Sequence, residues 1–143
     1  MLPLGRRAPL RAARAVMYAA CICTRLCSML IRFPHAEVIA VTARTYAERV
    51  KGLVGARELA DGYGMIFDMG AMGSWSMTMA GVFFPLDMIF MDDEPAVVGI
   101  VPSAPPNSRG PYGVQTSSRH VLEAPGGWAA RYKVRVGDRV TFA

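Results

Sequence analysis

One carboxylate in this sequence lies where an ionised group is costly. Asp87 follows Pro85 within the stretch Trp75–Asp93, the longest apolar run outside the N-terminus. Residues 86–92 are expected to form a strand whose two faces are apolar apart from this side chain, so the strand should be buried on both sides. An unpaired buried carboxylate costs several kcal/mol. Asp87 must therefore find hydrogen-bonding partners such as backbone amides, or it serves as a site acid or a ligand-binding group.

Two more charged residues could meet Asp87 in a polar site. Glu123 lies in the expected strand 120–124, on the same face as Val121, and it points either to solvent or to a site. Arg49 lies at the edge of the apolar stripe of an expected helix, so it either leans inward or keeps its charged end in water. An arginine between two carboxylates would form a ligand-binding site. The two carboxylates could also serve a hydrolase as acid and base, and the sequence does not fix their separation.

Methionines suggest a third kind of chemistry. Seven of the ten methionines lie between Met65 and Met91, and thioethers favour Cu(I). Most of them also fit the alternation of a strand core, in which methionine fills gaps. Cys21, Cys23 and Cys27 lie in an apolar segment without a fourth ligand, and there are only two histidines. We therefore predict no structural metal site and no cofactor.

The elements that would position these residues are mostly short strands. Strands are expected at residues 36–42, 65–69, 75–79, 86–92, 96–101, 120–124 and 139–142. A capping box, Thr45 with Glu48, should begin a helix that runs to about Leu53, with Tyr46, Val50 and Leu53 as its buried stripe. A helical turn is expected at 128–132, and a long loop with a possible functional role at 102–113. We predict a mainly β, single-domain sandwich or partly closed barrel of mostly antiparallel strands with one or two short helices.

The N-terminal part differs from the rest in charge. Residues 1–33 hold six arginines and no acidic residue, and an apolar stretch interrupted by Arg25 follows the first basic residues. We divide the chain into an extension, residues 1–35, and a compact β domain, residues 36–143. The extension resembles a signal or anchor, with residues 15–31 as the membrane-contacting part, unless translation starts at Met29. Export or membrane anchoring is expected, and a cytoplasmic protein if Met29 is the start.

The body of the chain is close to neutral. Residues 34–143 hold ten basic and eleven acidic residues, which sum to a formal charge of −1, so the overall charge of +5 resides in the extension. A nucleic-acid-binding domain needs a basic surface on the folded unit. We therefore expect no nucleic-acid partner.

Five short motifs in order resemble one family. They are Thr45-x-x-Glu-Arg-x-x-Gly-Leu, Gly64-Met-Ile-Phe, Met79 followed by Pro85-Leu-Asp-Met-Ile-Phe-Met-Asp, Val121-Leu-Glu, and Val136-Gly-Asp-Arg-Val. Together they cover roughly residues 37–142 and resemble the domain-of-unknown-function family 192. The resemblance implies a small, mostly β domain that often follows an export signal, and it implies no reaction. The chain departs from the family at 78–82, where a Trp-Met-Lys-Asn-Thr run is replaced by Thr-Met-Ala-Gly-Val.

The favoured function is a small non-catalytic binding or accessory domain at the cell envelope. Its partner would be an unidentified small molecule or an envelope component, with Arg49, Asp87 and Glu123 as candidate ligand-binding residues. Two alternatives remain open. One is a hydrolase-like enzyme that uses Asp87 and Glu123, and the other is a methionine-based Cu(I) carrier.

Overall fold

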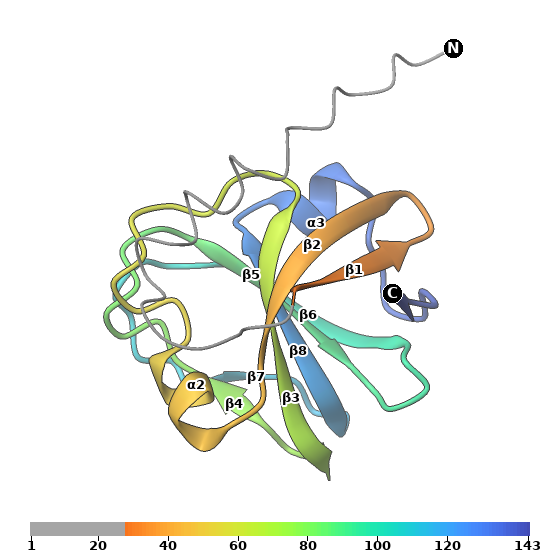
Figure 1. The fold of residues 1–143 in the computed structure, drawn as a ribbon, viewed down its shortest axis with the longest axis horizontal. Coiled ribbons are helices and arrows are strands. Elements are labelled where there is room, and N and C mark those ends of the chain that lie inside the picture. The colour runs from red at the N-terminus through yellow and green to blue at the C-terminus, as the bar shows by residue number, and fades with distance from the viewer. Residues whose placement is uncertain (1–27) are drawn as a thin grey trace.

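The computed structural model describes residues 28–143 (Figure 1). The three cysteines, and all but the last four residues of the predicted membrane-contacting stretch 15–31, lie outside the described residues. Those last four residues belong to the first strand, β1, which covers Ser28–Phe33. The folded unit thus includes residues that the sequence analysis assigned to the extension. Within residues 28–143, no helix has the length and apolar character needed to cross a membrane.

A seven-stranded sheet forms the body of the domain, in the order β6-β5-β8-β3-β2-β1-β9. Its strands pair antiparallel except β2 and β3, which are parallel and are connected through helix α2. β4 and β7 form a small second sheet. The bounds of the elements are β1 Ser28–Phe33, β2 Ala36–Ala43, α2 Tyr46–Lys51, β3 Tyr63–Gly73, β4 Ser76–Met77, β5 Leu86–Met91, β6 Val97–Ala104, β7 Tyr112–Gly113, β8 Ser118–Pro125, α3 Trp128–Arg131 and β9 Thr141–Phe142.

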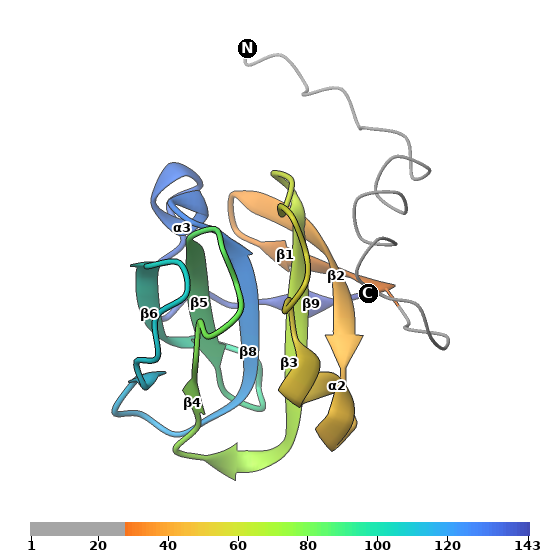
Figure 2. The same cartoon turned by 90° about the vertical axis from the view of Figure 1, so that its left-hand side faces the viewer.

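The large sheet curls so that its two outer parts approach each other (Figures 1 and 2). An isolated antiparallel bridge joins Ala96, just before β6, to Arg139, just before β9. The Val97 amide donates to the carbonyl of Asp138 at 2.9 Å, and the Gly137 amide donates to that of Val97 at 2.8 Å. The predicted mainly β fold is confirmed, as a partly closed barrel.

The sheet carries a separate apolar core on each face. The inner core lies inside the curl and is closed by β1, β9 and α3; its buried residues include Ile31, Ile89, Leu122 and Trp128. The outer core is covered instead by loops and by the small sheet of β4 and β7. It joins residues of the large sheet such as Phe90 to Tyr112 of β7 and to residues from the loops and turns: Leu53, Met79, Val82, Ala56, Leu59 and Val114. The central strand β5 is buried along its whole length, as predicted.

Helix α2 begins as the sequence predicts but buries a different part of its surface. The Thr45 hydroxyl accepts from the Glu48 amide at 3.2 Å, and the Glu48 carboxylate accepts from the Thr45 amide at 3.0 Å. The predicted buried stripe is wrong for Tyr46 and Val50, which are exposed; only Leu53 reaches the core. The helix has just six residues, so it ends before Leu53, and the turn after it carries that residue inward.

Other differences concern the lengths of strands. The predicted strand 75–79 is reduced to the two residues of β4, and Met79 is fully buried beyond it. The predicted loop 102–113 is partly regular, because β6 continues to Ala104 and β7 occupies its end.

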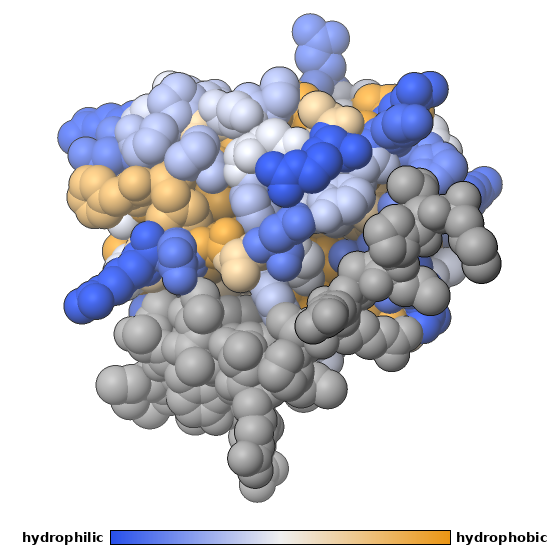
Figure 3. Space-filling view, turned by 90° about the horizontal axis from the view of Figure 1, so that it is seen from above, coloured by the Kyte–Doolittle hydropathy of each residue, from blue (hydrophilic) through white to orange (hydrophobic). Residues whose placement is uncertain are grey.

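Seen from above, the surface that is coloured is largely hydrophilic, with hydrophobic side chains at its left-hand edge (Figure 3).

Candidate functional site

Asp87 is fully buried, and its carboxylate is bound by backbone amides. Oδ1 accepts from the amides of Ser103 at 2.8 Å and Gly127 at 2.9 Å, and Oδ2 accepts from the amide of Ala129 at 2.8 Å. Charge-assisted hydrogen bonds of this kind offset the cost of desolvating a carboxylate. Asp87 is therefore satisfied within the fold.

These contacts give the carboxylate of Asp87 a structural role. The short helix α3 has Gly127 as its N-cap residue, which offers no capping side chain. Asp87 supplies the missing acceptor from β5 by accepting from the N-cap amide and from an amide of the first turn. The same carboxylate also holds Ser103 of β6, which has a left-handed backbone with φ 45°. Asp87 thus joins β5, β6 and the start of α3.

Glu123 is buried and lacks these partners. It is 3% exposed, and its Oε2 has no hydrogen-bond partner among the residues described. Burial raises the pKa of Glu123 to about 8, so the carboxyl group is protonated at neutral pH. The alternative that Glu123 faces solvent is therefore wrong. The other unpartnered buried groups in residues 28–143 are neutral: the Thr42 and Ser118 hydroxyls and the Trp128 indole N–H.

Methionines flank Glu123 on the sheet. Residues directly opposite each other on paired strands point to the same face, and Glu123 lies opposite Met65 of β3 and Met88 of β5. Both methionines belong to the outer core, together with Met79. The protonated acid thus lies at the floor of an apolar layer that loops and the two short strands β4 and β7 cover. The inner core, in contrast, is closed by strands β1 and β9 and by helix α3.

The structure does not bring the three predicted site residues together. Asp87 lies opposite Ala124, whereas Glu123 lies opposite Met88, so the two carboxyl groups point to opposite faces of the sheet. They cannot act on one substrate as an acid–base pair. The sequence analysis could not distinguish this arrangement from convergence, because it did not fix the register between β5 and β8.

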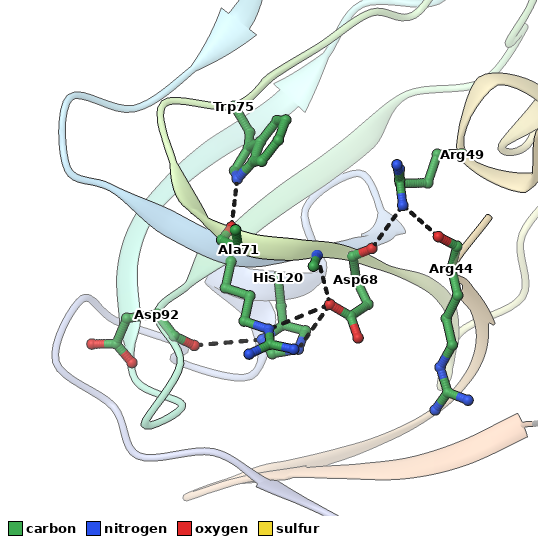
Figure 4. Close-up of polar contacts among 9 residues, drawn as sticks. Arg44, Arg49, Asp68, Ala71, Trp75, Asp92 and His120 are labelled. Carbon is green, nitrogen blue, oxygen red and sulfur yellow. Dashed lines mark hydrogen bonds and ion pairs between the residues drawn. The ribbon is translucent and has the colours of Figure 1, made fainter. Parts of the chain in front are cut away.

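Arg49 lies elsewhere, on α2, with its guanidinium against the middle of β3 (Figure 4). Its Nη1 donates to the carbonyl of Asp68 at 3.2 Å and to the carbonyl of Arg44. The guanidinium therefore connects the helix to the sheet. The predicted inward lean of Arg49 is correct in part, since the residue is only partly exposed, but its partners are carbonyls and not Asp87.

A polar cluster that the sequence analysis missed lies beside Arg49 (Figure 4). Asp68 Oδ1 accepts from the Gly70 amide at 2.9 Å and from Arg119 Nε at 3.4 Å, and it lies 3.8 Å from His120 Nε2. Burial works against ionisation of Asp68, but the Gly70 amide, His120 and Arg119 hold its pKa below the usual value. Burial lowers the pKa of His120, so the imidazole is neutral at pH 7.

This cluster ties β3 to β8 at an irregular point in their pairing. The register between the two strands shifts after Asp68 and His120, which lie opposite each other. Both residues lie within predicted strands, 65–69 and 120–124, and the pairing of these strands, which the sequence does not give, brings them together. In residues 28–143, no three of the His, Cys, Asp and Glu side chains are grouped closely enough to hold a metal ion.

Comparison with known proteins gives a family and a fold. The DUF192 family model, described as "Uncharacterized ACR", matches residues 29–142. No curated protein matches the chain. The structure resembles a crystal structure of a protein of unknown function from Novosphingobium aromaticivorans DSM 12444. That match has 31% identity and a TM-score of 0.74, and it covers 81% of this chain and 84% of the other.

A second crystal structure, from Sinorhizobium meliloti 1021, is similar over a larger part of the chain. That protein is described as a proposed transcription regulator. It is 27% identical to this chain with a TM-score of 0.79, and the match covers 83% of this chain and 96% of the other.

Proposed function

The chain belongs to the domain-of-unknown-function family 192 (DUF192), and from this membership we propose that it is a small non-catalytic binding domain with Glu123 in its ligand site. One observation carries the proposal. Glu123 is a buried carboxylic acid with an oxygen that no described residue binds, in an apolar layer. A strongly perturbed acid with no structural partner marks a candidate site, whereas Asp87 is fully used by the fold.

The chemistry of the site favours a neutral amphiphile. A protonated carboxyl group donates one hydrogen bond. Because it is uncharged, it repels an anionic ligand less than an ionised carboxylate would. Methionine side chains on both sides adapt to irregular apolar shapes. The ligand would therefore place an apolar part against Met65 and Met88 and a hydrogen-bond acceptor against Glu123. The loops and two-residue strands over this face support entry, because such segments open more readily than long paired strands.

A neutral dansyl-labelled alkyl amide is a suitable probe, measured at pH 6, where Glu123 is protonated. We expect saturable binding to the wild-type protein and to Glu123→Gln, which keeps a donor. Glu123→Leu removes the donor, and its affinity should fall about tenfold, the effect of one buried hydrogen bond. Met91→Leu conserves volume at a buried residue of β5 in the inner core and serves as the matched control, with affinity close to that of the wild type.

Two outcomes would contradict this proposal. One is the absence of saturable binding to the wild type, and the other is equal affinity of Glu123→Leu and Glu123→Gln. Cu(I) is the alternative occupant, since thioethers flank the acid on both sides. If the wild type takes Cu(I) from a chelator and Met65→Leu does not, the site is a metal site instead.

We also propose that the protein acts at the cell envelope, exported or membrane-anchored. The support is the arginine-rich, acid-free N-terminal stretch and the apolar residues that follow it. Cell fractionation, with mass spectrometry of the mature N-terminus, tests the location. A cytoplasmic protein that begins at Met29 would contradict it. The regulator-like neighbour does not lead us to propose nucleic-acid binding, because residues 34–143 carry a formal charge of −1.

A further inference from the structure

Apolar side chains are exposed along α2 and in the turn beside it. Tyr46 and Val50 lie one helical turn apart and are 78% and 64% exposed. Val54 follows, with its side chain against Gly81: a Cβ built on Gly81 would lie 3.2 Å from Val54 Cγ1. Phe83, two residues further along, is 70% exposed. We call Tyr46, Val50, Val54 and Phe83 the α2 patch. Helix α2 and the 78–85 segment lie on the side that faces the viewer in Figure 2.

Basic residues border the α2 patch. Arg44, Lys51 and Arg57 are exposed. Residues 44–58 hold four basic and two acidic residues, a sum of +2, whereas the other residues of 34–143 hold six basic and nine acidic residues, a sum of −3. Of the two acids, Glu48 has its carboxylate engaged by the amides of Arg44 and Thr45. A segment with a net positive charge thus borders the exposed apolar side chains of the α2 patch.

We propose that the α2 patch docks on the anionic surface of a lipid bilayer. Aromatic and aliphatic side chains would enter the interface, where tyrosine is favoured, while Arg44, Lys51 and Arg57 would meet lipid phosphates. A second copy of the chain is a poorer occupant, because a two-fold contact would bring the same basic residues opposite each other. The proposal does not depend on the Glu123 site.

Vesicle co-sedimentation with the full chain tests the proposal. Vesicles of phosphatidylglycerol and phosphatidylcholine should bind the wild-type protein, and vesicles of phosphatidylcholine alone should bind it much less. Val50→Asp and Phe83→Asp should each weaken binding by about tenfold or more, since each removes apolar contact and adds a repelled charge. Met72→Asp is the matched control, because Met72 is also an exposed apolar residue, at 42%, and residues 61–79 hold two acidic and no basic residues. It should bind as the wild type does.

The control also separates the α2 patch from the N-terminal stretch. If residues 15–31 alone carried membrane binding, Val50→Asp and Met72→Asp would bind equally well, and the proposal would be wrong. Absence of wild-type binding to anionic vesicles would overturn it too. So would a vesicle-free dimer that Val50→Asp dissociates, since the patch would then be an interface between copies. Circular dichroism of each variant establishes that it is folded.

Discussion

Replacing Asp87 with alanine should lower the free energy of unfolding by about 3–5 kcal/mol, the range for breaking a buried charged contact. The substitution leaves the buried or partly buried amides of Ser103, Gly127 and Ala129 without their acceptor. Each unpartnered buried donor costs about 1–3 kcal/mol, and water can recover part of that cost. Urea denaturation followed by circular dichroism at pH 7 measures the change.

Asp87→Asn separates the role of the charge from that of the shape. The amide retains one oxygen, but its NH₂ group would face a backbone N–H, so we expect a loss of about 2 kcal/mol or more. Asp138→Ala is the matched control. Asp138 is only partly buried and accepts one side-chain hydrogen bond, from the Arg135 amide at 2.8 Å, so its loss should be about 1 kcal/mol or less. A loss at Asp87 no larger than this would show that its three contacts do not stabilise the fold.

Local chemistry predicted those parts of the fold that short stretches of chain determine. The capping box at Thr45 and Glu48 satisfies its own amides, so it forms as expected. The alternation around Asp87 correctly predicted a strand buried on both faces, and the five motifs correctly predicted the family. The outcome for Asp87 follows from the same reasoning, since a buried carboxylate must find donors and here it finds backbone amides.

Features that depend on contacts far along the chain were not predictable in this way. Tyr46 and Val50 have helical spacing, yet periodicity does not say how many turns the helix has or which end reaches the core. β1 has the composition of a leader, and its pairing with β2 and β9 cannot be read from its own residues. Likewise, Glu123 is two positions from Val121 on the same face, but its burial depends on the loops that cover the outer core.

The two carboxyl groups of the central strands therefore have different roles. Asp87 belongs to the Pro-Leu-Asp motif and accounts for it structurally, because it fixes β6 and α3. Glu123 follows Val-Leu in the fourth motif, and its Oε2 has no hydrogen-bond partner among the described residues. A residue that the fold does not use, at a position where it costs stability, is better explained by ligand binding than by folding.

The stability of the wild-type protein should fall as the pH rises from 4.5 towards 8. Glu123 has a pKa of about 8 in the fold, against 4.5 for an unperturbed glutamate, so folding favours the protonated form. Its contribution is complete below pH 4.5 and is lost progressively as the pH approaches the folded pKa. A change of this size corresponds to at most about 5 kcal/mol, since one pKa unit is worth about 1.4 kcal/mol.

Comparison with Glu123→Gln isolates this effect from other titrating groups. Glutamine has a similar shape and does not ionise, so the variant should lack the loss between pH 4.5 and 8 and should be the more stable protein at pH 8. Urea denaturation of both proteins at pH 5, 6.5 and 8 measures the difference. Parallel curves would mean that the carboxyl group is already satisfied, by water or by an ion, and the argument for a ligand at Glu123 would lose its basis. A difference that widens with pH would show that the fold retains a buried acid at a cost, which is the condition on which the proposed site depends.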